Sequence, residues 1–252
     1  MLRVFIGFDH RQPISYNVLQ YSILKNSSVP VSITPLIYRQ LPVIQKLEYW
    51  RDEPILPEEG GKSGLTPFTF SRFMVPYLCN YEGSALFIDI DMLVLGDLKD
   101  LFAQFDSKYS VQVVKHEQRF EWASAILFNC EKCKILTPEF INNTDGLHSF
   151  KWLKDDEIGS LPKEWNHLVG YDEERSDAEL IHFTQGVPCH EEIGDCEYSG
   201  EWNKTVRELA CTLPWYDLMG TSVHAEFYRG RVISKLLAKQ KENMKVTVSL
   251  KN

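Results

Sequence analysis

The chain has 252 residues, of which 44% are hydrophobic and 25% are charged. This is the composition of an ordinary globular protein, so it excludes a disordered chain and fits one large α/β domain, or one domain with a small appendage. The formal net charge of −8 gives no overall attraction to nucleic acid, which excludes a general nucleic-acid-binding protein.

The sequence also lacks the marks of export and of membrane insertion. Its N-terminal apolar run is too short for a signal peptide and reaches Asp9 at once. There is no stretch of about 18 apolar residues, so we expect no transmembrane segment. Cys130 and Cys133 form a single CxxC without the second half of a zinc site. We interpret the scattered cysteines as reduced thiols and predict a cytoplasmic protein.

The first predicted elements are a strand, a helix and a second strand. Residues 4–8 form a short apolar run that suits a buried strand. A helical pattern opens at Pro13 and stops near Asn26, before a second strand over residues 31–38. A strand–helix–strand unit predicts a parallel sheet.

The middle of the chain alternates loops, helical patterns and apolar strands. Residues 50–67 are predicted as a loop, and Leu56 stands where a P-loop ending at Lys62 needs glycine, so that motif is excluded. Residues 69–80 are predicted to be helical, with Pro76 either in the first turn or at a kink. Further strands are predicted over 84–88, 109–115, 125–129 and 179–183, and the chain from about 201, including 223–243, is predicted to be mostly helical.

Two carboxylates stand at the end of a predicted buried strand, in Phe87-Ile88-Asp89-Ile90-Asp91. Side chains alternate along a strand, so Asp89 and Asp91 point the same way, with Cα atoms roughly 6.5 Å apart. Burying them unpaired would be costly, and a divalent cation removes that cost. One carboxylate can bind the metal while the other holds a hydroxyl or a water molecule. The alternative is a strand that simply ends in a solvated acidic turn.

The motifs around this pair occur in a recognisable order. An arginine-bearing helix around Arg72 precedes the DxD, and Phe128-Asn129, a Leu-Pro…Trp165-Asn166 segment and His182-Phe183…Gly186 follow it. In these motifs the chain resembles family 8 glycosyltransferases, which include glycogenin-like and lipopolysaccharide galactosyltransferase enzymes. The resemblance covers about residues 3–190 and looks closest to small glycosyltransferase-like proteins of bacteria and phages.

The resemblance implies an α/β fold of the GT-A type, with a mostly parallel central sheet flanked by helices. It places a catalytic domain over residues 1–200, and we expect residues 201–252 to form a helical C-terminal extension packed on the same domain. It also implies roles for individual residues. The implied metal ligands for Mn²⁺ or Mg²⁺ are Asp89, Asp91 and His182; the implied donor-binding residues are Phe8, Asp9, Arg72, Asp89 and Gly186; the implied catalytic residues are Asp155, Asp156 and Arg72.

Two departures from the family pattern affect these roles. The segment after His182 lacks the lysine that contacts the diphosphate in the family, so Lys62, Arg72 or His190 would have to supply that charge. Asp156 stands where an amide is usual. Simpler interpretations also stay open: His182 as a core histidine, Arg72 as a surface residue paired with Glu82, and Asp155-Asp156 as a solvated turn.

We therefore predict a metal-dependent glycosyltransferase. It would move a sugar from a nucleoside diphosphate sugar, with a UDP-sugar favoured, to the hydroxyl of a glycan or another acceptor, and the family resemblance implies retention of configuration. One alternative is a GT-A protein that binds a sugar nucleotide or glycan without turnover, which the missing lysine supports. The other is a haloacid-dehalogenase-type phosphatase, whose opening motif the segment 87–91 also resembles, although that motif normally lies near the N-terminus.

Basic residues gather near the C-terminus, in the last predicted helix. We interpret them as the solvated face of that helix, because a charge cluster alone is weak evidence. The alternative is a weak contact with an anionic membrane surface or an acidic acceptor, and nothing in the sequence indicates an oligomeric state. The residues are Arg229, Arg231, Lys235, Lys239, Lys241 and Lys245.

Overall fold

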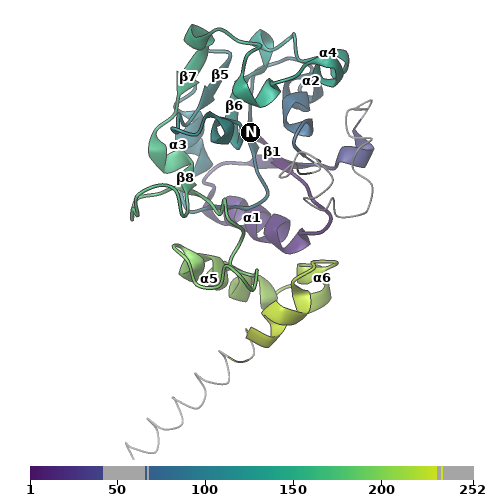
Figure 1. Cartoon of the computed structure of the whole chain (residues 1–252), viewed down its shortest axis with the longest axis vertical. Coiled ribbons are helices and arrows are strands. Elements are labelled where there is room, and N and C mark those ends of the chain that lie inside the picture. Colours follow the sequence, from purple (N-terminus) through teal and green to yellow (C-terminus); the bar gives the residue numbers. More distant parts are fainter. Residues whose placement is uncertain (42–65, 67, 232–233, 235–252) are drawn as a thin grey trace, which may run out of the picture.

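The fold is described from a computed structural model, which places residues 1–41, 66, 68–231 and 234. The predicted loop over residues 50–67 lies outside these residues apart from Thr66, and so does Lys62. Most of the basic residues of the last predicted helix also lie outside them. The described part is a mixed α/β structure, as predicted (Figure 1).

The main sheet has six strands in the order β2-β1-β3-β6-β5-β7. Neighbouring strands are parallel, except that β6 runs antiparallel to both β3 and β5, so the prediction of a mostly parallel central sheet is confirmed. The strands are β1 (Leu2–Gly7), β2 (Val31–Leu36), β3 (Ser84–Ile88), β5 (Val111–Val113), β6 (Ala125–Asn129) and β7 (Ile158–Ser160).

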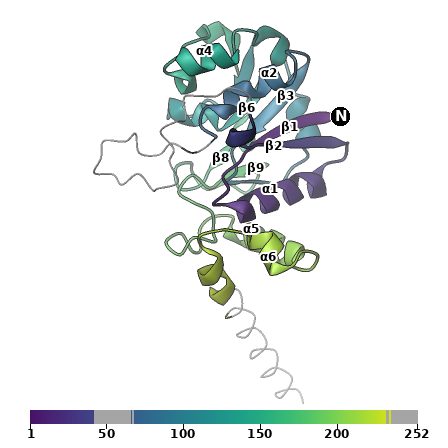
Figure 2. The same ribbon diagram turned by 90° about the vertical axis from the view of Figure 1, so that its right-hand side faces the viewer.

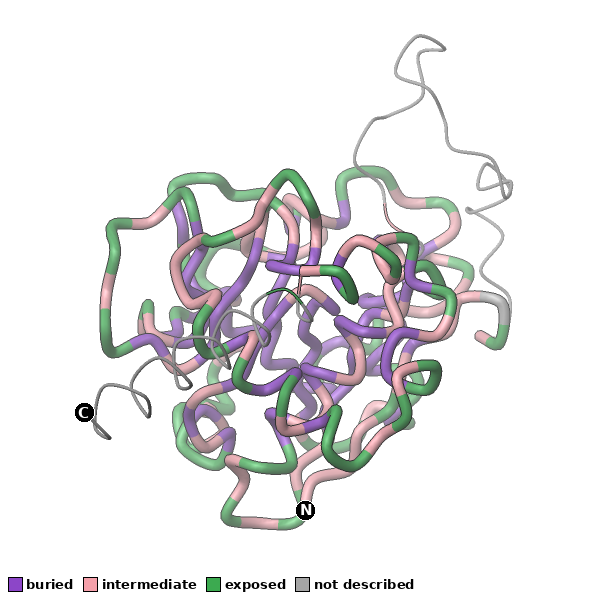
Figure 3. Tube along the Cα trace, turned by 90° about the horizontal axis from the view of Figure 1, so that it is seen from below, coloured by how far each residue is buried: buried purple, intermediate pink, exposed green. Residues whose placement is uncertain are grey.

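The central strands β1 and β3 lie side by side in parallel, with Ile6 opposite Ile88. Residues 85–88 of β3 are all fully buried, which is why this strand is a continuous apolar run rather than an alternating one. Because parallel strands end at the same edge of a sheet, the residues after β1 and those after β3 meet there. Figure 3 shows that the buried stretches form the interior of the fold and that the exposed ones are mostly in its outer loops.

A second sheet has three short strands in the order β4-β9-β8. In it β4 (Met92–Val94) is antiparallel to β9 (Leu180–His182), and β8 (His167–Leu168) is parallel to β9. Met92 is paired with His182, and the amide of Phe183 donates to the carbonyl of Asp91 at 3.0 Å. This pairing brings the chain that follows the main strand β3 beside a segment that lies much later in the sequence.

Helices cover both faces of the main sheet (Figure 2). Helix α1 (Pro13–Asn26) lies between the sheet and helices α5 (Ser199–Ala210) and α6 (Trp215–Met219). Its residues Leu19 and Ile23 belong to the main core, whereas Ile14 and Val18 belong to a second buried cluster with Trp202 of α5. Helix α1 is therefore apolar on two sides because it packs against two layers.

The predicted helix over residues 69–80 is shorter and less regular than expected. A 3₁₀ helix (Ser71–Met74) leads into α2 (Val75–Leu78), and Pro76 lies in the first turn of α2. Proline lacks an N–H and its ring clashes with the carbonyl four residues earlier, so one α-helix does not run through the whole segment. Residues Asn80 and Tyr81 then adopt φ values of 53° and 57°, which end the helix.

Several elements were not predicted because they are too short to carry a periodic pattern. The unpredicted helices are α3 (Leu98–Phe102), α4 (Pro138–Asn143) and the 3₁₀ helices Tyr38–Gln40, Arg119–Ala123, Cys130–Lys132, Leu147–Ser149, Asp155–Glu157 and Lys163–Trp165.

Among the described residues, no helix combines the length and the apolar composition needed to cross a membrane.

Candidate metal centre

Three predicted metal ligands meet where the two sheets adjoin. Asp89 directly follows β3, Asp91 directly precedes β4, and His182 is the last residue of β9. One ligand atom from each residue lies within 4.8 Å of the other two. The closest measured approach is 3.4 Å, between Nε2 of His182 and Oδ1 of Asp91. The structure thus brings together three residues that are far apart in the sequence.

This group is buried and its polar atoms are incompletely paired. Asp89 is 8% exposed and His182 is 4% exposed. Oδ1 of Asp91 and Nδ1 of His182 are buried atoms without a hydrogen-bond partner among the described residues. Unpaired buried polar atoms cost free energy, and a divalent cation would compensate for it. Two carboxylates and an imidazole are also a donor set that suits Mn²⁺ or Mg²⁺, so the residues fit such an ion.

The charges of the group also favour a cation. Burial raises the pKa of Asp89 to about 7, although Arg72 acts against this rise, and the neighbouring Asp91 adds to it. Burial by itself lowers the pKa of His182, but Asp91 and the other nearby carboxylates outweigh it, so the pKa lies above its ordinary value. A metal ion that binds this group would therefore displace protons from it.

Arg72 is anchored to the protein on several sides. Its Nη2 lies 3.1 Å from Oδ1 of Asp89, and its Nη1 donates to Oδ2 of Asp89 at 3.4 Å. The same guanidinium donates to the carbonyls of Thr69 and Ala123 at 3.1 and 2.5 Å and stacks over the ring of Phe87. The alternative that Arg72 is a surface residue paired with Glu82 is wrong, because Arg72 is only 6% exposed and its partner is Asp89.

Glu121 is an acidic residue of this site that the sequence did not reveal. It lies in the 3₁₀ helix Arg119–Ala123, immediately before β6, and its Oε2 is 3.9 Å from Nδ1 of His182. Burial raises the pKa of Glu121, and His182 partly offsets that rise. No motif marks this residue. Only the antiparallel pairing of β6 with β3, in which Ala125 lies opposite Ile88, places it near the site.

The predicted donor-binding residues Phe8 and Asp9 follow β1 and so lie at the same sheet edge as Asp89. Asp9 is 5% exposed and accepts two hydrogen bonds from Nε of Arg11, at 3.0 and 3.1 Å, and one from its Nη2, at 2.6 Å. The ring of Phe8 makes an edge contact with Tyr16. This arrangement fixes the chain at the carboxyl ends of β1 and β3, where α/β sheets bind ligands.

Gly186 lies in the turn that follows His182. Its φ is +117°, a conformation that favours glycine, and a Cβ there would lie 2.7 Å from Nδ1 of His190. A side chain at residue 186 would therefore have to displace the imidazole of His190.

Asp155 and Asp156, the predicted sugar-facing pair, lie in an exposed 3₁₀ helix (Asp155–Glu157). Asp155 pairs with Nη2 of Arg119 at 3.2 Å, and its side chain is 90% exposed. In the described part of the chain, no hydrogen bond or ion pair links either aspartate to the three candidate metal ligands. The Arg119 contact does connect their helix to the segment that carries Glu121.

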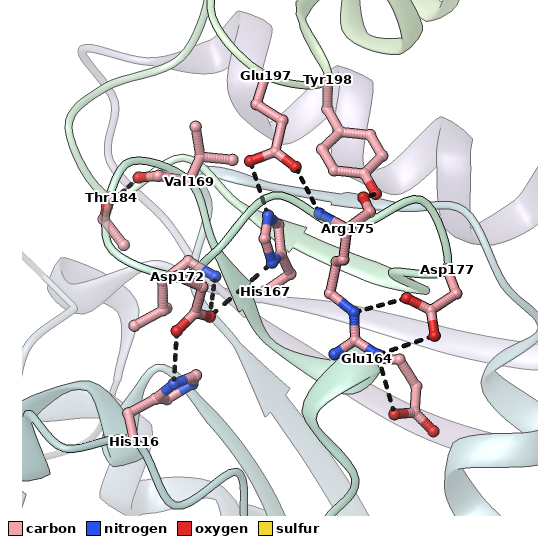
Figure 4. Close-up of polar contacts among 11 residues, drawn as sticks. His116, Glu164, His167, Val169, Asp172, Arg175, Asp177, Thr184, Glu197 and Tyr198 are labelled. Atoms are coloured by element: carbon pink, nitrogen blue, oxygen red, sulfur yellow. Dashed lines mark hydrogen bonds and ion pairs between the residues drawn. The ribbon is translucent and has the colours of Figure 1, made fainter.

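A second buried polar network supports β8, the strand next to β9 (Figure 4). Nε2 of His167 lies 2.9 Å from Oε2 of Glu197, and its Nδ1 lies 3.9 Å from Oδ2 of Asp172. Asp172 also accepts from the amide of Leu168 at 2.9 Å and lies 3.7 Å from Nδ1 of His116. The carboxylate of Asp172 thus accepts a hydrogen bond from a strand amide and lies near two buried imidazoles.

We expect Asp172→Ala to destabilise the protein by about 2 kcal/mol, because the amide of Leu168 loses its hydrogen-bond acceptor and two buried imidazoles lose a nearby carboxylate. Urea denaturation followed by circular dichroism measures this. Asp177→Ala is the matched control: Asp177 pairs only at the surface with Arg175 and its side chain is 72% exposed. Its loss should leave the stability almost unchanged. Equal effects of the two replacements would contradict the structural importance of the network.

Comparisons with known proteins agree with this architecture. No family model matches the chain. Protein CDI of Arabidopsis thaliana is 37% identical over 232 residues, which make up 82% of this chain and 86% of that protein.

Solved structures with a similar fold are glycosyltransferases. The galactosyltransferase LgtC, solved with donor and acceptor sugar analogues, has a TM-score of 0.60 at 10% identity, over 85% of this chain and 99% of LgtC. The bifunctional glycosyltransferase WbbM has a TM-score of 0.59 at 15% identity, over 88% of this chain but only 51% of WbbM, so the chain spans about half of that protein. GlyE of Streptococcus pneumoniae has a TM-score of 0.55 at 16% identity, over 92% of this chain and 64% of GlyE. The chain therefore has the GT-A fold of glycosyltransferases and belongs to the same protein family as Protein CDI.

Proposed function

We propose that the protein is a metal-dependent glycosyltransferase that moves a sugar from a nucleoside diphosphate sugar, with a UDP-sugar favoured, to an acceptor hydroxyl. The observation that carries this proposal is the convergence of Asp89, Asp91 and His182, within a GT-A fold, at the edge where β1 and β3 end. The family 8 resemblance adds the expectation that the anomeric configuration is retained.

The candidate ligands would hold Mn²⁺ or Mg²⁺, which supplies the positive charge that a departing diphosphate needs. The protein's own part is to place the ligands. Arg72 contacts both oxygens of the Asp89 carboxylate. Asp91 is the member of the group that a ligand can reach, because its side chain is 33% exposed whereas that of His182 is 5% exposed.

The diphosphate also needs a cation from the protein, and the structure favours His190 among the three candidates. Arg72 is committed to Asp89 and to two carbonyls, and Lys62 lies outside the described residues. His190 stacks on His224 with ring centroids 3.9 Å apart. Burial and His224 lower the pKa of His190, and nearby carboxylates that include Asp91 act against this. A bound diphosphate would favour the protonated ring, because opposite charges stabilise each other.

Thermal shift with a panel of sugar nucleotides, with and without Mn²⁺, tests the proposal. A donor present at about 100 times its dissociation constant stabilises the native state by about 2.7 kcal/mol. We expect at least one UDP-sugar to raise the melting temperature only when Mn²⁺ is present, and we expect Mn²⁺-dependent hydrolysis of that donor in the absence of acceptor. Binding without any hydrolysis would favour the non-catalytic alternative. Phosphate release from simple phosphoesters would favour the phosphatase.

A further inference from the structure

The imidazole of His182 lies between two carboxylates. Nε2 faces Asp91 at 3.4 Å, and Nδ1 faces Glu121 at 3.9 Å. An imidazole binds a metal through one nitrogen, and its other nitrogen then carries a proton that needs an acceptor. Nδ1 of His182 is buried and has no hydrogen-bond partner among the described residues. Glu121 is therefore the acceptor that the structure offers to that nitrogen.

Glu121 stands outside the set of direct ligands. The group whose ligand atoms lie within 4.8 Å of one another consists of Asp89, Asp91 and His182. The backbone that follows Glu121 is nevertheless fixed to this group. The amide of Asp89 donates to the carbonyl of Ser124 at 3.0 Å, and the hydroxyl of Ser124 donates to the carbonyl of Glu121 at 2.7 Å. The guanidinium of Arg72 binds the carbonyl of Ala123. The backbone next to Glu121 is thus held by hydrogen bonds to Asp89 and Arg72, two residues of the same site.

We propose that Glu121 is a positioning residue, whose carboxylate accepts a hydrogen bond from Nδ1–H of His182 and so fixes the tautomer that presents Nε2 to the metal. This inference rests on the proposed function, because it assumes the metal centre. It also explains why a third carboxylate stands in a buried acidic site. Without a cation Glu121 adds repulsion and desolvation cost, whereas with a cation it raises the basicity of the ligand.

The test is Glu121→Gln, and the measurement is Mn²⁺ affinity by the electron paramagnetic resonance of free Mn²⁺, with no sugar nucleotide present. We expect an affinity loss of about 10- to 100-fold. The metal-free variant should be at least as stable as the wild-type protein, because a carboxylate has been removed from an acidic cluster. A residue with a purely structural role would behave in the opposite way, with lower metal-free stability and unchanged affinity. Glu117→Gln is the control, because Glu117 is exposed and close in the chain.

Asp91→Ala separates this inference from the proposed function. If Asp91→Ala binds Mn²⁺ as tightly as the wild type, the metal centre itself is wrong. If it loses Mn²⁺ while Glu121→Gln keeps wild-type affinity, only the role of Glu121 is overturned. A measurement on the wild-type protein is independent of any variant's folding. In ¹⁵N-histidine spectra of the Mg²⁺-loaded protein, His182 should carry its proton on Nδ1, and a proton on Nε2 would overturn the inference.

Discussion

Replacement of Asp91 by alanine is expected to abolish Mn²⁺-dependent donor binding and to slow sugar transfer by on the order of 10³-fold or more, since electrostatic stabilisation of the leaving group is lost. Asp91 is the most accessible of the three candidate ligands and the one whose oxygen approaches Nε2 of His182 most closely. Without it, Asp89 and His182 remain, and two ligands do not hold Mn²⁺ or Mg²⁺ tightly.

The same replacement should leave the fold intact, because it removes a partly exposed side chain. It also removes the contact with His182, but it relieves the repulsion of Asp91 with Asp89 and Glu121. Circular dichroism and a melting curve without metal would check this. Transfer is measured with the donor identified by thermal shift, and Mn²⁺ binding is measured separately. Asp100→Ala removes the same charge from the exposed surface of α3 and should change neither quantity. Undiminished transfer by Asp91→Ala would contradict the proposed function.

The sequence predicted those elements whose apolar pattern is long enough to indicate that they are buried. β3 and β6 were located by uninterrupted apolar runs, because strands buried on both faces have no polar positions. Helix α1 was bounded correctly by Pro13 and by the polar residues after Asn26. The strands β4 and β8, with three and two residues, carry no such pattern. Their positions depend on pairing with β9, which is a long-range contact.

The candidate site was predictable to the extent that its residues lie on these elements. Both aspartates belong to the same group, but they lie in the turn between β3 and β4 and not within a strand, so the alternation expected from the sequence does not explain their approach. His182 was found only through the order of motifs, because a histidine in an apolar strand is otherwise indistinguishable from a core residue.

Two partners in the site had no local signal at all. Glu121 reaches His182 because β6 is antiparallel to β3, and no pattern in the sequence fixes that register. Arg72 was assigned to a donor or to Glu82, yet it pairs with Asp89 from the 3₁₀ helix Ser71–Met74, which precedes α2. Contacts of this kind depend on tertiary packing, because a buried guanidinium pairs with the carboxylate that the fold places next to it.

The metal-free protein is expected to lose stability as the pH rises from about 5 to about 7, by up to about 3 kcal/mol. In the folded protein the pKa of Asp89 is about 7, against its ordinary value of 3.8, which applies in the unfolded chain. Over this range the folded state therefore keeps a proton that the unfolded state has released, so deprotonation favours unfolding. The raised pKa of His182 acts with the same sign, because its contribution is lost as the pH rises through that value.

Mn²⁺ should reverse this trend, because it binds the ionised form of Asp89 and its affinity rises as protons leave the site. Urea denaturation at several pH values, once with EDTA and once with Mn²⁺, measures both slopes. Asp89→Asn removes the titrating group while keeping its size, so its metal-free stability should vary much less with pH and Mn²⁺ should add little. A wild-type protein with the same flat profile as Asp89→Asn would show that the buried carboxylate is not protonated at pH 5. The main electrostatic reason for placing a metal ion there would then be gone.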